Sequence, residues 1–143
     1  SINGGSLILF LFLVTWGCDA GAYYAGTYLG RSKLSPKISP NKTIEGAIGG
    51  LAVSIIAAVA GKSWLLQSLS VRDALTIGLF LGTLGQLGDL AESLLKRSAG
   101  VKDSSSLIPA HGGLLDKVDS LLFTAPALYY YLSIREYAGS MIV

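Results

Sequence analysis

The stretch GSLILFLFLVTWGCDAGAYYAGTYL, from Gly5 to Leu29, decides the fold, because it is apolar over a length that can cross a bilayer. A transmembrane helix needs about 20 mainly apolar residues. Period-2 alternation is absent from the stretch, and an open sheet facing lipid would leave backbone groups without hydrogen bonds. The stretch therefore predicts a membrane-spanning helix, and this helix carries one carboxylate, Asp19, in its interior.

The composition of the whole chain agrees with a membrane protein. Of the 143 residues, 51% are hydrophobic and only 14% are charged, and the mean hydropathy is +0.56. The 18 glycines fit as well, since glycine is more frequent in membrane helices than in soluble ones. A net charge of +2, with no run of basic and aromatic residues, gives no indication of nucleic-acid binding. The one cysteine, Cys18, lies in an apolar run and is expected to be a packing residue.

Three further apolar segments predict helices, at about 43–60, 71–96 and 114–137, beside the first at 5–29. The predicted fold class is all-α: a polytopic membrane protein with about four transmembrane helices and two long loops, 30–42 and 97–113. The second helix is the shortest and the weakest as a full span. Pairs of glycines four residues apart predict that helix backbones approach closely. These pairs are Gly17/Gly21, Gly26/Gly30, Gly46/Gly50 and Gly78/Gly82.

The first long loop and its junction with the second helix have signals of their own. Pro36 and Pro40 predict that the loop is extended and free of helix. Either Asn41 or Thr43 is expected to cap the helix that follows.

Basic residues predict the orientation in the membrane. Eight of the eleven lie in or beside the two long loops, so the positive-inside rule places both loops in the cytoplasm and both ends of the chain outside. The eight are Arg31, Lys33, Lys37, Lys42, Lys96, Arg97, Lys102 and Lys117. The first apolar run has no basic segment before it, so no signal peptide is expected. The chain is expected to be a fragment or a processed form of a longer protein.

Acidic residues lie where lipid would disfavour them. They are Asp19, Asp89 with Glu92, and Asp116 with Asp119, all in the predicted cytoplasmic half of the bundle. Charges at membrane depth usually face a bundle interior or a water-filled cavity. Helical spacing places Glu92 or Ser93, and Lys96, on the face of Asp89, and it places Asp116 and Asp119 together on another. We therefore expect one polar cavity, open to the cytoplasm, to hold these acids.

Several carboxylates in one cavity would repel one another unless a cation joins them. Mg²⁺ prefers carboxylate oxygens and commonly binds through one or two of them together with substrate phosphates. Nearby basic side chains can bind phosphate oxygens. They are Lys42, Lys96, Arg97, Lys102 and Lys117. Metal-binding acids beside phosphate-binding cations are typical of phosphoryl or nucleotidyl transfer.

Each residue also has a structural interpretation when taken singly. Lysines at helix ends can set topology and snorkel to the membrane surface. Asp19 can be a hydrogen-bonding residue within the membrane, and Asp116 can be a first-turn acid that suits the helix dipole. For His111 the roles of general base, ligand and loop residue all stay open. The functional interpretation depends on the joint arrangement.

The segment from Ser93 to Asp119 resembles the C-terminal signature of the phosphatidate cytidylyltransferases, also called CDP-diacylglycerol synthases. Three upstream stretches resemble the family too: WGCDAGAYYAG around Asp19, SPKISPNKTIEG, and GQLGDLAESLLKR. One signature position departs, because Lys117 stands where the family usually has Arg, which keeps the charge but loses the bidentate fork. The matching positions are Ser93, Leu95, Lys96, Arg97, Lys102, Asp103, Ser105, Ile108, Pro109, His111, Gly112, Gly113, Leu114, Asp116, Val118 and Asp119.

The resemblance implies an enzyme that makes CDP-diacylglycerol and pyrophosphate from CTP and phosphatidate, with Mg²⁺ and a second, monovalent cation such as K⁺. It implies that residues 1–143 are the C-terminal transmembrane catalytic region, without the N-terminal helices, in the bacterial inner membrane with the site facing the cytoplasm. We expect a homo-oligomer, a dimer, in contact with membrane lipids. The implied metal ligands are Asp89, Asp116 and Asp119, with Asp19 as a further acid. The implied catalytic residues are Asp89, Lys96, Asp116 and Asp119. The implied substrate ligands are Lys42, Lys96, Arg97, Lys102, His111 and Lys117.

Three alternatives are weighed against this function. An ion-coupled transporter would also carry intramembrane acids, but it gives no account of the Lys-Asp, His-Gly-Gly and Asp residues at fixed gaps. A CDP-alcohol phosphotransferase would need paired Asp-Gly and Ala-Arg residues, whereas Asp89 is followed by Leu90. A non-catalytic helical subunit would not be expected to keep every acid of the signature.

Overall fold

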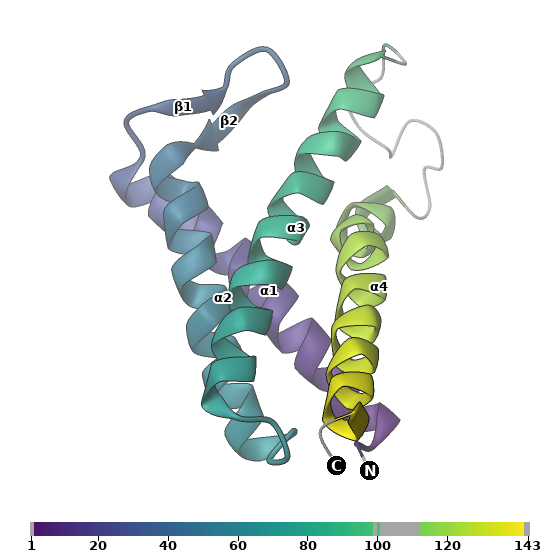
Figure 1. Ribbon diagram of the computed structural model, residues 1–143. Helices are drawn as coiled ribbons and strands as arrows, with labels where there is room; N and C mark the ends of the chain where they lie inside the picture. Colours follow the sequence, from purple (N-terminus) through teal and green to yellow (C-terminus); the bar gives the residue numbers. More distant parts are fainter. Residues whose placement is uncertain (1, 99, 101–111, 142–143) are drawn as a thin grey trace.

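The computed structural model describes residues 2–98, 100 and 112–141, and side chains for all of these except residues 112–119. Four helices make up most of the described chain (Figure 1). Their bounds are α1 Gly4–Leu29, α2 Ile44–Trp64, α3 Val71–Ser98 and α4 Gly112–Met141. By length and composition, α1, α2 and α3 can each cross a membrane, and α4 has 30 residues. The predicted all-α, polytopic membrane fold is confirmed, with α2 longer at its C-terminal end than predicted.

The loop between α1 and α2 forms a hairpin that the sequence did not predict. Strand β1, Lys33–Ser35, pairs antiparallel with β2, Ser39–Thr43. The expectation of an extended segment without helix is confirmed, but the expectation that strands are absent is wrong. Among the residues of the two strands, only Thr43 is buried. Since neither face needs to be apolar, backbone pairing forms here without the alternating pattern that marks a half-buried strand.

Side chains at the start of α2 hold the hairpin in place. Thr43 is the N-cap of α2, because its side-chain oxygen accepts a hydrogen bond from the Gly46 amide at 3.0 Å. The Glu45 carboxylate accepts hydrogen bonds from the amides of Arg31 at 3.1 Å and Ser32 at 3.2 Å. Of the two predicted caps, Thr43 is therefore the one used, and Glu45 adds an anchor for the turn that leaves α1.

Small residues bring α2 close to both α1 and α3, as the glycine pairs predicted. The buried residues of α2 are all small and recur every three or four positions. A methyl group on Gly50 would lie 2.8 Å from the Cys18 carbonyl oxygen of α1. One on Gly78 of α3 would lie 2.7 Å from the Ile55 Cα of α2. These contacts are made by backbone atoms, so the three helices can pack this closely only where side chains are absent.

The apolar core occupies the half of the bundle that lies away from the hairpin. Phe10 of α1, Ala58 of α2 and Ile77 of α3 are among its fully buried members, and Leu128 of α4 closes it. Many large apolar side chains on the outside remain exposed, such as Trp16 at 51%. An apolar exterior of this kind suits a surface that faces lipid.

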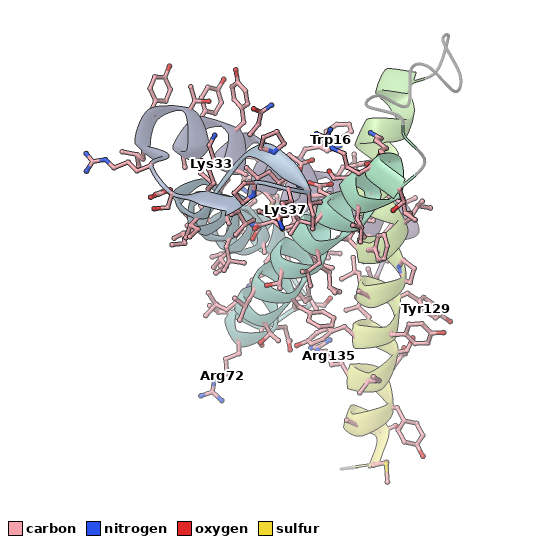
Figure 2. All side chains as sticks on the ribbon, turned by 90° about the horizontal axis from the view of Figure 1, so that it is seen from above. Trp16, Lys33, Lys37, Arg72, Tyr129 and Arg135 are labelled. Carbon is pink, nitrogen blue, oxygen red and sulfur yellow. The ribbon has the colours of Figure 1, made fainter. Side chains whose placement is uncertain are left out.

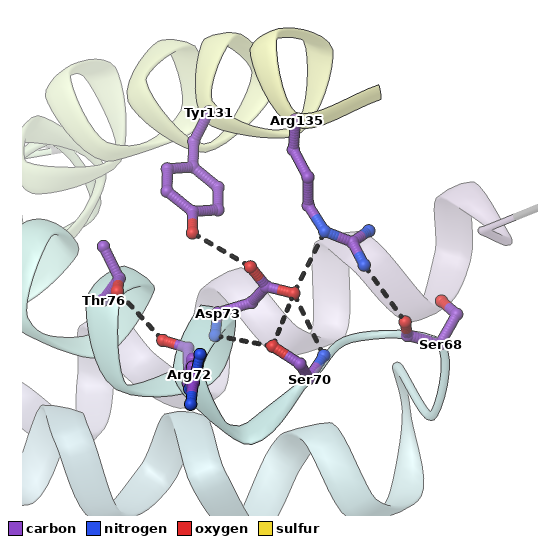
Figure 3. A network of polar contacts seen from close by, with 7 residues as sticks. All are labelled: Ser68, Ser70, Arg72, Asp73, Thr76, Tyr131 and Arg135. Carbon is purple, nitrogen blue, oxygen red and sulfur yellow. Dashed lines mark hydrogen bonds and ion pairs between the residues drawn. The ribbon is translucent and has the colours of Figure 1, made fainter. Parts of the chain in front are cut away.

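A polar clamp joins α3 to α4 at the end of the bundle near the termini (Figures 1 and 3). Asp73 accepts a hydrogen bond from the Tyr131 hydroxyl at 3.2 Å and pairs with the Arg135 Nε at 3.0 Å. Arg135 also donates to the Ser68 carbonyl oxygen at 3.4 Å. Asp73 and Ser70 cap the start of α3 reciprocally, through bonds of 3.0 Å and 3.1 Å. The clamp fixes α4 against the first turn of α3.

Candidate active site

A cavity of about 660 Å³ lies where the hairpin meets α1, α2 and α3. Its lining is rich in polar and charged side chains, among them Asp19 from α1, Lys42 from β2, and Asp89 from α3. The sequence predicted that one polar cavity would hold the intramembrane acids. For the acids whose side chains are described, this prediction is confirmed.

One face of α3 provides most of the charged side chains that line the cavity. Gln86, Asp89, Glu92, Ser93 and Lys96 all line it, at the spacing of three and four residues that places side chains on one helix face. The interpretation of Asp89, Glu92, Ser93 and Lys96 as one face is therefore correct. The Lys96 ammonium lies 2.8 Å from the Glu92 carboxylate one turn earlier.

Lys42 reaches this face of α3 from the hairpin. Its Nζ lies 3.8 Å from Asp89 Oδ2, and the two side chains are 32% and 27% exposed. Lys33 and Lys37 also project from the hairpin (Figure 2), but the described lining of the cavity does not include them. Lys42 is thus the lysine of the hairpin that the fold brings to the cavity.

Arg97, which the sequence assigned as a phosphate ligand, lies outside the described lining of the cavity. Its Nε donates a hydrogen bond of 3.4 Å to the Ile38 carbonyl oxygen at the hairpin turn. The side chain therefore connects the C-terminal end of α3 to the tip of the hairpin, 59 residues away along the chain.

The remaining predicted site residues lie outside the described side chains. The sequence assigned them as metal or phosphate ligands, and those assignments stay predictions. They are Lys102, His111, Asp116, Lys117 and Asp119.

Gln86 is a site residue that the sequence interpretation missed. Its Nε2 donates to the Ala47 carbonyl oxygen of α2 at 2.9 Å and lies 3.6 Å from the Cys18 sulfur of α1. Gln86 therefore joins three helices at the wall of the cavity. Its position three residues before Asp89, on the same helix face, was a signal that could have identified it.

The donors in the cavity are of the chemical type that Mg²⁺ prefers. Asp19 and Asp89 provide carboxylate oxygens, and Mg²⁺ commonly takes one or two protein carboxylates and completes its shell with water and substrate phosphates. Within the described part of the chain, no three His, Cys, Asp or Glu side chains are grouped closely enough to hold a metal ion. A site with more protein ligands would have to include side chains outside that part, such as Asp116 or Asp119.

Comparison with known proteins places the chain in a family. The model of the cytidylyltransferase family matches residues 2–135. The chain belongs to the cytidylyltransferase family. This match confirms the resemblance seen in the sequence. The cavity described above is the candidate active site of this family member.

Individual relatives agree with this assignment. The chain is 45% identical to the phosphatidate cytidylyltransferase of Bacillus subtilis over 131 residues, which is 92% of this chain and 49% of the relative. It is 49% identical to the enzyme of the same name from Synechocystis, over 90% of this chain and 44% of the relative. A Staphylococcus aureus phosphatidate cytidylyltransferase is 50% identical over 88% of this chain and 48% of its own length. The chain spans about half the length of the curated relatives it matches.

Proposed function

We propose that the protein is a phosphatidate cytidylyltransferase, which transfers a cytidylyl group from CTP to phosphatidate in the membrane and releases pyrophosphate. The observation that carries the proposal is the cavity where Asp19, Lys42, Asp89 and Lys96 meet, in a family whose relatives carry this name. Nothing in the described residues or the comparisons favours the transporter alternative.

In the proposed reaction, a phosphate oxygen of phosphatidate attacks the α-phosphorus of CTP in line. The new bond joins this oxygen to the α-phosphorus, and the bond from the α-phosphorus to the bridging oxygen breaks, so that pyrophosphate leaves. No protein nucleophile takes part. The work of the protein is then positioning and charge neutralisation.

The residues have distinct parts in this proposal. Lys42 and Lys96 contact phosphate oxygens from two walls of the cavity. Asp89, with Asp19, Asp116 and Asp119, holds Mg²⁺, which when bound neutralises charge on the nucleotide phosphates. Lys102, His111, Lys117 and Arg97 are further substrate ligands of the proposal.

The surroundings of the site form a second part of the proposal. The chain has helices that suit an integral membrane protein. We propose that the site faces the cytoplasm from a bacterial inner membrane, and that phosphatidate enters sideways from the inner leaflet. We further propose a homodimer, N-terminal helices that complete the lipid entrance, and a second, monovalent cation such as K⁺.

The test is pyrophosphate release from CTP by the purified full-length protein in detergent, with and without phosphatidate and with Mg²⁺ and K⁺ varied. Release that requires both substrates and Mg²⁺ is expected. Asp116→Asn is expected to lower turnover by at least about a hundredfold, because removing a positioned charge-stabilising group commonly costs that much. Glu136→Gln removes one charge from an exposed position of the same helix and is the matched control.

Two results would contradict the proposal. Release that is independent of CTP or phosphatidate would overturn the function itself. Normal turnover in a folded Asp116→Asn protein would overturn the metal assignment and leave the function in place.

A further inference from the structure

The contact between Lys42 and Asp89 joins a proposed phosphate ligand to a proposed metal ligand. The two side chains come from different walls of the cavity, and 3.8 Å separates Lys42 Nζ from Asp89 Oδ2. At 32% and 27% exposure both side chains remain accessible to water. Such a pair is attractive, but it is weak enough to be broken by a competing ion.

The backbone of Lys42 is fixed, while its side chain has freedom to move. The next residue, Thr43, is buried, caps α2 and pairs with Lys33 across the hairpin. The Lys42 ammonium, in contrast, sits on a flexible four-carbon chain that can reach several points of the cavity. The residue can therefore change its partner without any movement of the hairpin.

Lys96, another lysine of the cavity lining, forms its described ion pair along its own helix. Its ammonium lies 2.8 Å from Glu92, one turn away on the same helix. Glu92 is not one of the proposed metal ligands. Among the described side chains, the ion pair of Lys42 is with Asp89, a proposed metal ligand.

We propose that Lys42 acts as a built-in counter-ion of Asp89 that a divalent cation displaces, after which its ammonium turns to a nucleotide phosphate. This inference rests on the proposed function. An ammonium and a divalent cation compete for the same carboxylate oxygens and repel each other at that distance. Metal binding at Asp89 therefore releases Lys42, and the released charge favours an incoming triphosphate.

The proposal predicts opposite changes in two affinities when Lys42 is neutralised. Without the ammonium, one competitor for Asp89 and one repelling positive charge are removed, so the metal binds more tightly. The nucleotide loses a cationic ligand, so CTP binds more weakly. If Lys42 served only as a phosphate ligand, or only stabilised the fold, the affinity for the metal alone would not increase.

The first experiment titrates the protein in detergent with Mn²⁺, without nucleotide, and measures free Mn²⁺ by electron paramagnetic resonance. Mn²⁺ is the probe because, like Mg²⁺, it accepts octahedral oxygen ligands. Lys42→Gln is expected to bind Mn²⁺ about two- to fivefold more tightly, the change that corresponds to losing a partly exposed ion pair. Lys42→Arg keeps the charge and is expected to stay near the wild-type affinity. Lys33→Gln removes the same charge from an exposed position of the same hairpin and controls for a general charge effect.

A second experiment uses the unaltered protein, so that it does not depend on how a variant folds. The acylation of individual lysines is followed by mass spectrometry with and without Mn²⁺. Release from Asp89 should raise the acylation rate of Lys42 about twofold or more on addition of Mn²⁺, in keeping with a competed ion pair. The rate at Lys33 should not change.

The outcomes separate this inference from the proposed function. Unchanged or weaker Mn²⁺ binding in Lys42→Gln, or Mn²⁺ that leaves the acylation of Lys42 unchanged, overturns the inference. If Lys33→Gln raises the Mn²⁺ affinity as much as Lys42→Gln does, the inference is overturned as well, because the loss of any nearby positive charge would then explain the change. A protein that releases no pyrophosphate from CTP overturns the proposed function, whatever the Mn²⁺ titration shows.

Discussion

At the residue scale, Thr43 is the point where the hairpin, α1 and α2 meet. Its side-chain oxygen accepts a hydrogen bond from the Gly46 amide nitrogen, 3.0 Å away. The same oxygen faces α1, since a methyl group on Gly26 would lie 3.2 Å from it. Its backbone pairs with Lys33. The position of Lys42 in the cavity therefore depends on the residue next to it.

We predict that Thr43→Ala lowers the free energy of unfolding by about 1 kcal/mol, the usual cost of removing a side-chain N-cap. Thr43→Ser keeps the hydroxyl that caps Gly46 and should retain most of the stability. Denaturant titration of the purified protein in detergent measures both. Equal stability of the Ala and Ser variants would show that the hydrogen bond to Gly46 contributes nothing.

Helix spacing made some site residues predictable and left others out of reach. Asp89 and Lys96 were placed on one face by their separation along α3, and the structure agrees. The contact between Arg97 and Ile38 of the hairpin was not predicted, and the assignment of Arg97 as a phosphate ligand stays a prediction. Spacing along one helix cannot show where a distant loop folds back. Spacing from Asp89 could have placed Gln86 on the same helix face, but its hydrogen bond to Ala47 depends on how α2 packs.

At the element scale, the closeness of α2 and α3 depends on glycine. Ser54 of α2 donates a hydrogen bond to the Gly78 carbonyl oxygen at 2.9 Å, which requires the two backbones to lie nearly in contact. The glycine spacing predicted this packing. The sequence did not predict the hairpin between α1 and α2, because its two strands are held by backbone pairing and by Glu45, not by an apolar pattern.

We predict that Gly78→Ala destabilises the protein, because the added methyl group would lie 2.7 Å from Ile55 Cα and the helices would have to separate. Overpacking of this kind costs about 1–3 kcal/mol. Gly139→Ala is the matched control, since a methyl group there meets nothing within 4 Å and alanine favours helix. Thermal unfolding in detergent compares the two. If Gly78→Ala were as stable as Gly139→Ala, close packing at this crossing would be disproved.

At the scale of the whole molecule, the bundle is divided along its length. The apolar core around Phe10 and Ile77 and the Asp73–Arg135 clamp occupy the half near the termini. The cavity and the hairpin occupy the other half, with Lys42 and Asp89. The apolar core and the candidate site thus occupy different halves of the bundle. The sequence predicted this division through the positions of its acids, but not which acid meets which base.

The division of the bundle also predicts how it sits in the membrane, and single cysteines test that orientation. Lys37, at the hairpin, and Gln67, between α2 and α3, are exposed near opposite ends of α2. The native Cys18 is only 3% exposed, so it should give little background with a membrane-impermeant thiol reagent. Because the basic residues gather at the hairpin end, Lys37→Cys should react only after the membrane is opened to the reagent, whereas Gln67→Cys should react in intact cells. The reverse pattern would mean that the bundle has the opposite orientation. Labelling of both cysteines from one side would mean that α2 does not span the membrane. The reverse pattern would place the cavity where cytoplasmic CTP cannot reach it by the proposed route, so the orientation of α2 decides whether the site can act as proposed.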